Sequence, residues 1–546
     1  MNVTTTTPQD QPEPAAVASI RRLGVLPAWL LAPLQAEVVA EALRQAVPEL
    51  ADGHIALKAC KIKRMLLKDD ARWVGTYTLK LDDPASGKRE LSLRGTLTPP
   101  HLRSATPAAP AAPQVALGAE GWHCTLPALG LVLVPEPPEH ELAAMPQLTD
   151  PDASRAMLEQ GMRTTPGYHD ITIEVCTPEV LSYKPGSRCT LRYHLRYPPA
   201  PADRGWPSTV IAKTYRKDSK GRNAYEGMNA LWNTPLARGE VVALAEPLAY
   251  IPEHKVLVQG PVAGTQSLED LLKAALTADT AAAYAELSGY MIRTAAGLAA
   301  LHSSGVCHGE LVTLDERWAE LHDLSARLYA AVPDLTGAAD TLQAQLEALA
   351  AATPAGAPVP THGTFNPEQV MIDGPHIGFI DFDDFCMAEP ALDVGLFLAA
   401  INDTGLNALD DQQARDPATR RARLARLAAI GEVFLAFYEK LAPLDRKRVA
   451  LWQAWSCLRD TLHFWIKAKP AEPDNGLLML LDTLQTIGVI PPADPAAATA
   501  TVQQARRRLA IPAARYAAYA SALLAGAGVS LNDLAELLGE VLPLIG

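Results

Sequence analysis

The sequence predicts an α+β protein in which a small β-rich lobe precedes a large helical lobe, with an extra module of β-hairpin and helix in front. Two observations predict this architecture. Segments of alternating apolar and polar residues, the pattern of half-buried strands, dominate the first half of the chain, at 72–83, 88–99 and 176–215. Apolar residues at helical spacing dominate from residue 268 onward, apart from a short β-rich insert at 369–382.

Composition restricts the classes of function. The 546 residues carry a net charge of −13, so the whole chain has no electrostatic attraction to nucleic acid or to anionic lipid. Its seven cysteines are scattered and form no C-x-x-C pair, which argues against a disulfide framework or a zinc site and favours the reducing cytoplasm. The start lacks the pattern of a secretory signal, and the most apolar run, 23–34, is interrupted by Pro27 and Pro33. We therefore expect no membrane span.

The length implies two or three packed units. We expect a disordered tail at 1–16, an N-terminal module at 17–150, a β-rich lobe at 151–262 and a helical lobe at 263–546, with the chemistry in the segment 360–395. Helical periodicity predicts helices at about 34–47, 268–275, 280–303, 314–331, 337–351, 390–403, 418–441, 445–468, 476–486, 498–523 and 530–541.

Two segments of the chain resemble each other. "CKIKRMLLKDDARWVGTYTLKL", from Cys60, aligns without a gap on "CTPEVLSYKPGSRCTLRYHLRY", from Cys176. The identical pairs are Cys60 and Cys176, Lys68 and Lys184, Arg72 and Arg188, Tyr77 and Tyr193, and Leu79 and Leu195. The strand that follows carries Lys213 in the second copy, and the matching place in the first copy has Gly95. Two unrelated hairpins of similar period are the alternative interpretation.

Several blocks occur in a characteristic order. They are "VIAKTYR", "LVQGPVAGTQSLEDLL", "LAALH", "HGTFNPEQV" and "IDFDDFCMAEPALDVGLFLA". Together they resemble the aminoglycoside phosphotransferase and choline kinase-like family over roughly 175–400. The resemblance implies a bilobal protein-kinase-like fold that uses ATP and Mg²⁺.

The resemblance also implies how a nucleotide is held. Lys213 on its strand would bind phosphate oxygens, and Glu226 on the next helix would hold Lys213 in place. The turn at 183–188, with Lys184, would cover the phosphates, and Gln259 lies on the strand that leads to the helical lobe. A surface lysine on an edge strand is the plainer interpretation of Lys213.

A metal site is implied in the second half of the chain. Asp381 directly follows an apolar strand, where a carboxylate is costly unless it is paired or bound to metal. In the alternative interpretation, Asp381 pairs with an arginine and binds no metal. Gln369 stands where the family has an asparagine that binds a second metal, and Gln369 keeps an amide oxygen. His362 and Asp393 match family residues that support the loop.

The base position departs from the family. The family pattern is His-Gly-Asp, and here it reads His-Gly-Thr, with Thr364. Threonine does not accept a proton near neutral pH, and general-base catalysis contributes roughly 10²–10⁴-fold. Asn366, Glu368 or Asp383 is a candidate replacement, and Glu368 is the better proton acceptor.

Three functions remain open at this point. The chain is an ATP-dependent phosphotransferase with weakened catalysis that acts on a hydroxyl of a sugar, amino sugar or amino alcohol. Alternatively, it is a pseudokinase that binds nucleotide or, through its N-terminal module, a protein partner. In the third interpretation it is an unrelated α+β protein that carries "IDFDD" by chance.

Overall fold

The computed structural model describes residues 15–103, 115–136, 142–184, 186–199, 204–238, 241–469 and 473–490. The chain divides into two compact units. Unit 1 holds the described parts of Met1–Pro138, Leu314–Ala352 and Ala454–Pro491, and unit 2 those of Glu139–Thr313 and Thr353–Gln453. The predicted tail lies outside the described residues except for Ala15 and Ala16, and the predicted helices 498–523 and 530–541 lie wholly outside them.

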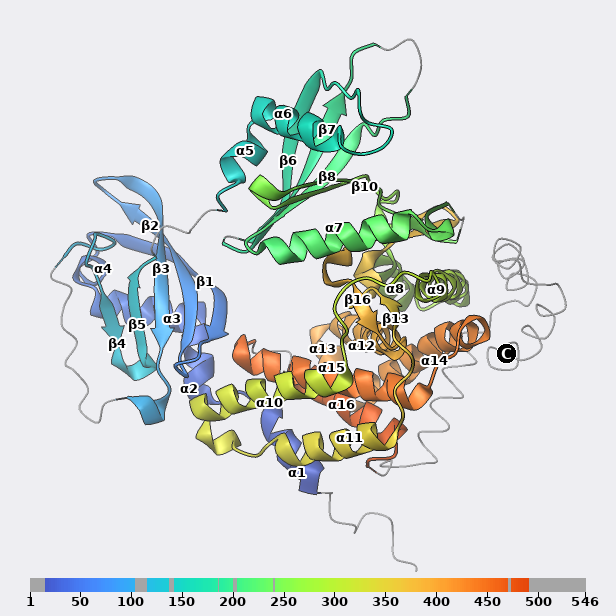
Figure 1. Cartoon of the computed structure of the whole chain (residues 1–546). Coiled ribbons are helices and arrows are strands. Elements are labelled where there is room, and N and C mark those ends of the chain that lie inside the picture. The colour runs from blue at the N-terminus through green and yellow to red at the C-terminus, as the bar shows by residue number, and fades with distance from the viewer. Residues whose placement is uncertain are drawn as a thin grey trace, which may run out of the picture. The chain divides into compact units, whose positions relative to one another are not determined.

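The β-rich lobe of unit 2 is a five-stranded antiparallel sheet (Figure 1) in the order β10-β11-β8-β7-β6. Its strands are β6 (Val175–Lys184), β7 (Arg188–Arg196), β8 (Thr209–Tyr215), β10 (Pro247–Ile251) and β11 (Val256–Gln259). Helices α5 (Met145–Thr149) and α6 (Pro151–Met162) precede the sheet, and α7 (Asp218–Trp232) follows β8. Alternate residues of β7 and β8, such as Leu191, Tyr193 and Ala212, are buried in one core with Leu158 of α6.

The helical part of unit 2 supports the loop that carries His362 and the segment that carries Asp381, Asp383 and Asp384. Its helices are α8 (Leu268–Ala278), α9 (Ala281–His302), α12 (Ala391–Asn407), α13 (Asp411–Arg415), α14 (Pro417–Leu441) and the first part of α15 (Arg446–Ile466). Short strands lie among them, namely β9 (Ala243–Leu244), β12 (Gln266–Ser267), β13 (Val359–Thr361), β14 (Val370–Asp373), β15 (His376–Phe379) and β16 (Cys386–Ala388). α8 begins at the expected capping box, in which Ser267 and Asp270 bond each other's backbone N–H.

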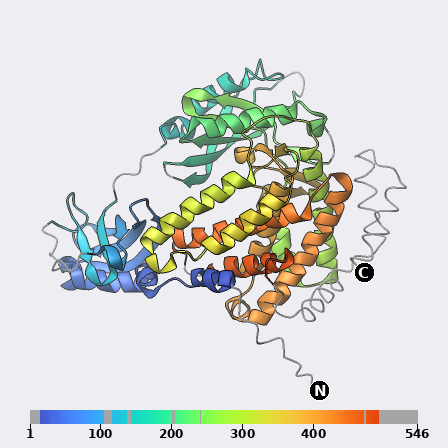
Figure 2. The ribbon, with the colours of Figure 1, turned by 60° about the horizontal axis from the view of Figure 1, so that its bottom comes forward.

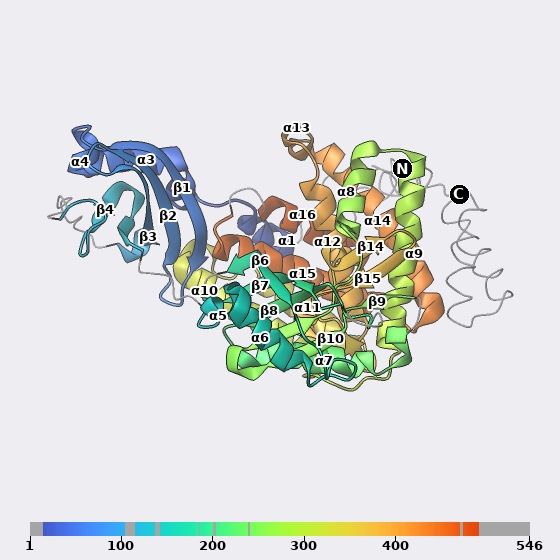
Figure 3. The same cartoon turned by 90° about the horizontal axis from the view of Figure 1, so that it is seen from above.

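Unit 1 contains a second five-stranded antiparallel sheet, in the order β1-β2-β3-β5-β4. Its strands are β1 (Ala56–Leu67), β2 (Trp73–Asp83), β3 (Gly87–Leu97), β4 (Cys124–Leu126) and β5 (Leu131–Pro135). Its helices are α1 (Ala15–Ile20), α2 (Ala28–Leu31), α3 (Ala36–Ala46), α4 (Pro48–Ala51), α10 (Leu314–Ala331), α11 (Asp340–Ala352), the end of α15 and α16 (Pro473–Thr486). α3 packs on β1 (Figure 3), and α10 lies beside α11 (Figure 2).

The predicted hairpin 72–83 and 88–99 is confirmed as β2 and β3, and most predicted helices agree with the structure within a few residues. The strands β4, β5 and β10 were not predicted, because three to five residues give too short a periodic signal.

One segment bears on the expectation about membrane spans. Among the described residues, Ala15–Leu34 is long and apolar enough to span a membrane by length and composition, with a mean hydropathy of 1.4. In the structure this segment forms four short helices, and its Ile20, Leu23 and Leu30 are fully buried.

One carboxyl in unit 1 makes stability depend on pH. Burial raises the pKa of Asp482 on α16 to about 6. A carboxyl whose pKa is higher in the folded state opposes folding once it ionises, so this contribution destabilises the protein as pH rises from about 4 through 6. We expect Asp482→Asn to raise the melting temperature more at pH 7.5 than at pH 4.5. Asp323→Asn, at an exposed position on α10, is the control. An equal shift at both pH values would contradict this assignment.

Candidate active site

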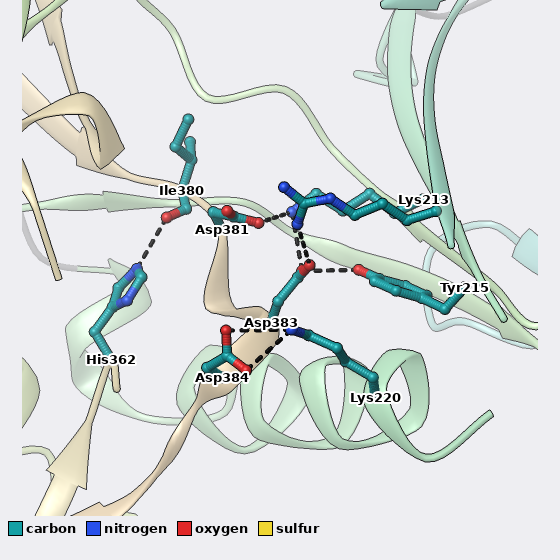
Figure 4. A network of polar contacts seen from close by, with 9 residues as sticks. Lys213, Tyr215, Lys220, His362, Ile380, Asp381, Asp383 and Asp384 are labelled. Atoms are coloured by element: carbon teal, nitrogen blue, oxygen red, sulfur yellow. Dashed lines mark hydrogen bonds and ion pairs between the residues drawn. The ribbon is translucent and has the colours of Figure 1, made fainter. Parts of the chain in front are cut away.

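The site in unit 2 is built around Lys213, which lies on β8 at the position that the sequence predicted (Figure 4). Its Nζ donates to Asp381 and, at 3.0 Å, to Oδ1 of Asp383. The Lys213 side chain is only 12% exposed. Burial opposes its charge, but the charges of Asp383 and Asp381 outweigh burial and raise the pKa of Lys213. The lysine is therefore a fixed cation in the site, and the plainer interpretation as a surface lysine is wrong.

Asp383 is held by donors from the β-rich lobe. Tyr215 donates its hydroxyl to Oδ1 at 2.7 Å, and the Arg188 guanidinium lies 3.5 Å from Oδ2. Burial and then the charge of Asp383 raise the pKa of Tyr215 well above its ordinary value, so the phenol keeps its proton and donates. Because Asp383 is 3% exposed and bound by three donors, it anchors Lys213. The suggestion that Asp383 replaces the missing base is therefore not supported by this geometry.

Asp381 follows β15 in the left-handed backbone region, with φ of +69°. This conformation costs a residue other than glycine about 1–2 kcal/mol, and Asp and Asn tolerate it best. Burial disfavours the charge of Asp381, but the charge and hydrogen bond of Lys213 prevail and lower its pKa to about 2. Its side chain remains 32% exposed. Asp381 is thus an ionised carboxylate with part of its surface open to a ligand.

The structure corrects the role given to Glu226. Its side chain on α7 is 49% exposed, and its Oε2 lies 3.9 Å from the Nε2 of His308. It does not hold Lys213, because the part of α7 that faces the site presents other residues. Lys220 pairs with Asp384 at 3.0 Å, and Asn223 donates to the carbonyl of Phe385.

The loop around His362 is fixed by buried hydrogen bonds. Asp393 accepts the backbone N–H of His362 at 2.7 Å and that of Gly363 at 2.9 Å, as the resemblance implied. The Nε2 of His362 donates to the carbonyl of Ile380, directly before Asp381. Gly363 has φ of +86°, and a Cβ there would lie 2.0 Å from the carbonyl oxygen of Asp384, so only glycine fits.

Two further residues, His302 and Tyr438, form hydrogen bonds that lead to Asp393. His302, at the end of α9, contacts Asp393 through Nε2 at 3.1 Å and the hydroxyl of Tyr438 through Nδ1 at 2.6 Å. Burial first, and then the charge of Asp393, raise the pKa of Tyr438, so its hydroxyl donates to Nδ1 and Nε2–H donates to Asp393.

The base position and its neighbours form a compact local turn. The Oε1 of Gln369 accepts the backbone N–H of Asn366, and the Nδ2 of Asn366 donates to the carbonyl of Thr364. Thr364 is half-buried, and Glu368, four residues further along the chain, is exposed. Gln369 therefore uses one lone pair of its amide oxygen to close the loop, and its role as a metal ligand stays a prediction.

The carboxylate of Asp381 suits Mg²⁺ as a ligand. No group of three or more His, Cys, Asp or Glu side chains that could hold a metal occurs among the described residues. Mg²⁺ commonly binds through one or two carboxylates together with substrate phosphates, so it needs no such cluster. Asp381, ionised and partly exposed, is a carboxylate of this kind.

The other two residues that the sequence assigned to nucleotide binding, Lys184 and Gln259, lie on the same sheet as Lys213. Lys184 is exposed at the end of β6, opposite Arg188 across the turn, whose residue 185 is not described. Gln259 ends β11 and is buried, opposite Ile211 of β8. No contact in the structure assigns either residue to a nucleotide, and both roles stay predictions.

Sequence reasoning missed four residues of the site, namely Arg188, Tyr215, His302 and Tyr438. Tyr215 carries a signal, because a residue two positions after Lys213 on a strand points to the same face. Tyr438 carries none, because 136 residues separate it from His302 in the sequence.

These features define a site that joins the β-rich sheet of unit 2 to the segment after β15. A model of the phosphotransferase enzyme family (APH) matches residues 224–430, so this segment carries the family resemblance seen in the sequence. A search of curated proteins finds no significant match.

Three similar solved structures have low TM-scores. An aminoglycoside phosphotransferase bound to ADP is 16% identical, covering 58% of this chain and 94% of its own, with a TM-score of 0.36. A choline kinase from Streptococcus pneumoniae is 13% identical (57% and 94% covered, TM-score 0.36). A glucosamine kinase in complex with glucosamine, ADP and phosphate is 13% identical (79% and 95% covered, TM-score 0.41).

The Tyr215 hydroxyl gives a matched test of the anchor. Tyr215→Phe removes a hydrogen bond to a buried carboxylate, so we expect a loss of roughly 1–3 kcal/mol in the free energy of unfolding. Tyr183→Phe in the same lobe is the control, because its buried hydroxyl has no hydrogen-bond partner. Chemical denaturation of both variants measures the difference. Equal effects of the two substitutions would remove Tyr215 from the anchor.

Proposed function

We propose that this chain is a small-molecule kinase that transfers a phosphoryl group from ATP, with Mg²⁺, to a hydroxyl of a sugar, amino sugar or amino alcohol. The observation that carries the proposal is the bond of Lys213 on β8 to the carboxylates of Asp381 and Asp383. The family match over residues 224–430 supports the same class of reaction.

In this proposal, some residues position the reacting groups and others neutralise their charge. Phosphoryl transfer depends mainly on positioning and on neutralising charge, with little covalent help from the protein. Lys213 supplies a buried cation for phosphate oxygens, and Asp381 supplies a carboxylate for Mg²⁺. When bound, Mg²⁺ neutralises the negative charge that develops on the phosphates. Asp383 keeps Lys213 in place.

Catalysis is weakened at the base position. Thr364 accepts no proton near neutral pH, and Asp383 is occupied by its three donors. Glu368, exposed and four residues after Thr364 in the same loop, is the remaining carboxylate of the loop that can accept the hydroxyl proton. We assign this reaction to the cytoplasm, because the seven cysteines are scattered along the sequence and form no C-x-x-C pair.

A pseudokinase is the second candidate, and Thr364 favours it. In that case Lys213 and Asp381 bind nucleotide, no phosphoryl group is transferred, and the N-terminal module provides a surface for a protein partner. Binding without turnover distinguishes this candidate from the first.

Calorimetric titration of ATP into the full chain, with and without Mg²⁺, tests the site. Asp381→Asn keeps a residue that tolerates the left-handed conformation and removes the charge. We expect Mg²⁺-dependent binding that weakens at least tenfold in this variant, a change of about 1.4 kcal/mol. Asp384→Asn, three residues after Asp381 and paired with Lys220, is the control. Binding that ignores both Mg²⁺ and Asp381→Asn would contradict the metal role.

Restoring the family's base gives a test of catalysis. Thr364→Asp should raise phosphoryl transfer or ATP hydrolysis by at least about tenfold, against the roughly 10²–10⁴-fold that general-base catalysis supplies. Glu368→Gln is the companion variant, since it lowers the basal rate if Glu368 already accepts the proton. If Thr364→Asp leaves the rate unchanged while ATP still binds, the weakened-kinase interpretation fails and the pseudokinase is preferred.

A further inference from the structure

The two β-sheets of the protein have the same topology. Written from the first strand, the orders are β1-β2-β3-β5-β4 and β6-β7-β8-β11-β10. In each sheet three strands form a meander, and a later hairpin adds its second strand next to the third strand of the meander. The sequence repeat from Cys60 and Cys176 covers only the first two strands, whereas the topological repeat covers all five.

The strand register is also the same. Cys60 lies opposite Leu79, and Cys176 lies opposite Leu195, the residues that the gap-free alignment equates. Further along, Leu66 lies opposite Val74 as Ser182 lies opposite Thr190. A register shift immediately precedes Leu66 in the first copy and Ser182 in the second copy. Two unrelated hairpins have no reason to share a bulge at the same place.

The same tertiary contact ties each sheet to its preceding helices. Tyr77 and Tyr193 are equivalent and fully buried. The hydroxyl of Tyr77 donates to the carbonyl of Pro33 at 3.1 Å, and that of Tyr193 donates to the carbonyl of Leu148 at 2.8 Å. Each acceptor lies in the short helix before the one that packs on the sheet, which is α3 in unit 1 and α6 in unit 2.

The first copy has lost the polar residues of the site. Lys213 lies opposite Thr190, and the equivalent of Thr190 in the first copy, Val74, lies opposite Thr96. Thr96 therefore occupies the position of Lys213, which corrects the assignment of Gly95. Between β3 and β4 the described residues contain a 3₁₀ turn but no α-helix, so they include no counterpart of α7.

We infer that residues 15–136 are a duplicated small lobe without a nucleotide site, and that the turn equivalent to the phosphate-covering turn has become a docking surface for helices α10 and α15 of the same chain. In unit 2 the turn between β6 and β7 carries Arg188, which reaches Asp383. The equivalent turn, between β1 and β2, makes its contacts with helices of unit 1.

Three contacts form this docking surface. Arg327 of α10 donates to the carbonyl of Leu67 at 2.8 Å, and its Nε lies 3.2 Å from the exposed carboxylate of Asp69. Trp73, fully buried at the start of β2, donates its Nε1–H to the carbonyl of Trp465 on α15 at 3.0 Å. The ion pair with Asp69 is weak because Asp69 is exposed, so the two bonds to backbone carbonyls supply most of the attachment.

Hydrogen exchange tests the docking surface in the full chain, without nucleotide. Arg327→Gln and Trp73→Phe should each accelerate exchange of the amides in 314–331 and 454–466 by roughly tenfold, because each removes a hydrogen bond at a part-buried or buried carbonyl. Trp122→Phe is the matched control, since Trp122 is equally buried in unit 1 and its Nε1 has no hydrogen-bond partner. If Trp73→Phe does not fold, Arg327→Gln decides. Unchanged exchange in 314–331 and 454–466 would overturn the docking role.

The loss of the second nucleotide site has a separate test. Titration of ATP with Mg²⁺ should give at most one equivalent bound per chain, removed by Lys213→Ala. Two equivalents, or a site that survives Lys213→Ala and is lost in Thr96→Ala, would overturn the inference. If no ATP binds at all, the proposed function fails, and the exchange experiment still decides the role of the turn.

Discussion

The ion pair of Lys213 with Asp383 joins the β-rich sheet of unit 2 to the segment after β15, and the candidate site depends on it. A buried ion pair gains little unless its geometry is good and its remaining hydrogen-bonding positions are filled, because both charges are taken out of water. Tyr215 and Arg188 fill those positions on Asp383. The buried Asp383 therefore has a donor for each carboxylate oxygen, and Lys213 is held without a helix glutamate, so that Glu226 is left exposed on α7.

The same requirement shapes the loop around His362. Asp393 is fully buried, and its carboxylate oxygens accept hydrogen bonds from two backbone N–H groups and from His302. His302 in turn needs Tyr438 as the donor to its second nitrogen. From Tyr438 through His302 to Asp393, each side chain fills a hydrogen-bonding position of the next. An unpaired polar group in the interior costs about 1–3 kcal/mol, so these bonds stabilise the loop. The loop that bears Thr364 thus keeps its shape although its base is missing.

Much of this arrangement could be read from the sequence. Helices and the β2–β3 hairpin follow from periodicity, and Lys213, Asp381 and Asp393 follow from motif blocks whose order constrains the fold. The partners of those residues could not be predicted. Tyr215 and Arg188 meet Asp383 only after the lobes have packed, and sequence spacing carries no information about which donors fill a buried carboxylate. The register of the third strand likewise could not be fixed by alignment alone. The alignment matched Gly95 to Lys213, whereas the strand pairing in the structure matches Thr96 to Lys213.

The two copies of the small lobe show why a fold outlasts its chemistry. In a β-sheet, alternate residues face opposite sides, and the register is set by the apolar side. Tyr77, Leu79 and Leu93 keep that side buried in unit 1 as Tyr193, Leu195 and Val210 do in unit 2. The other side is free to change without disturbing the register. Replacing a lysine by Thr96 there removes a cation that would need buried carboxylates as partners, and the sheet is left intact for a role in packing. The polar side of the sheet therefore determines whether a copy retains the buried lysine of the candidate site, and the apolar side determines that it folds.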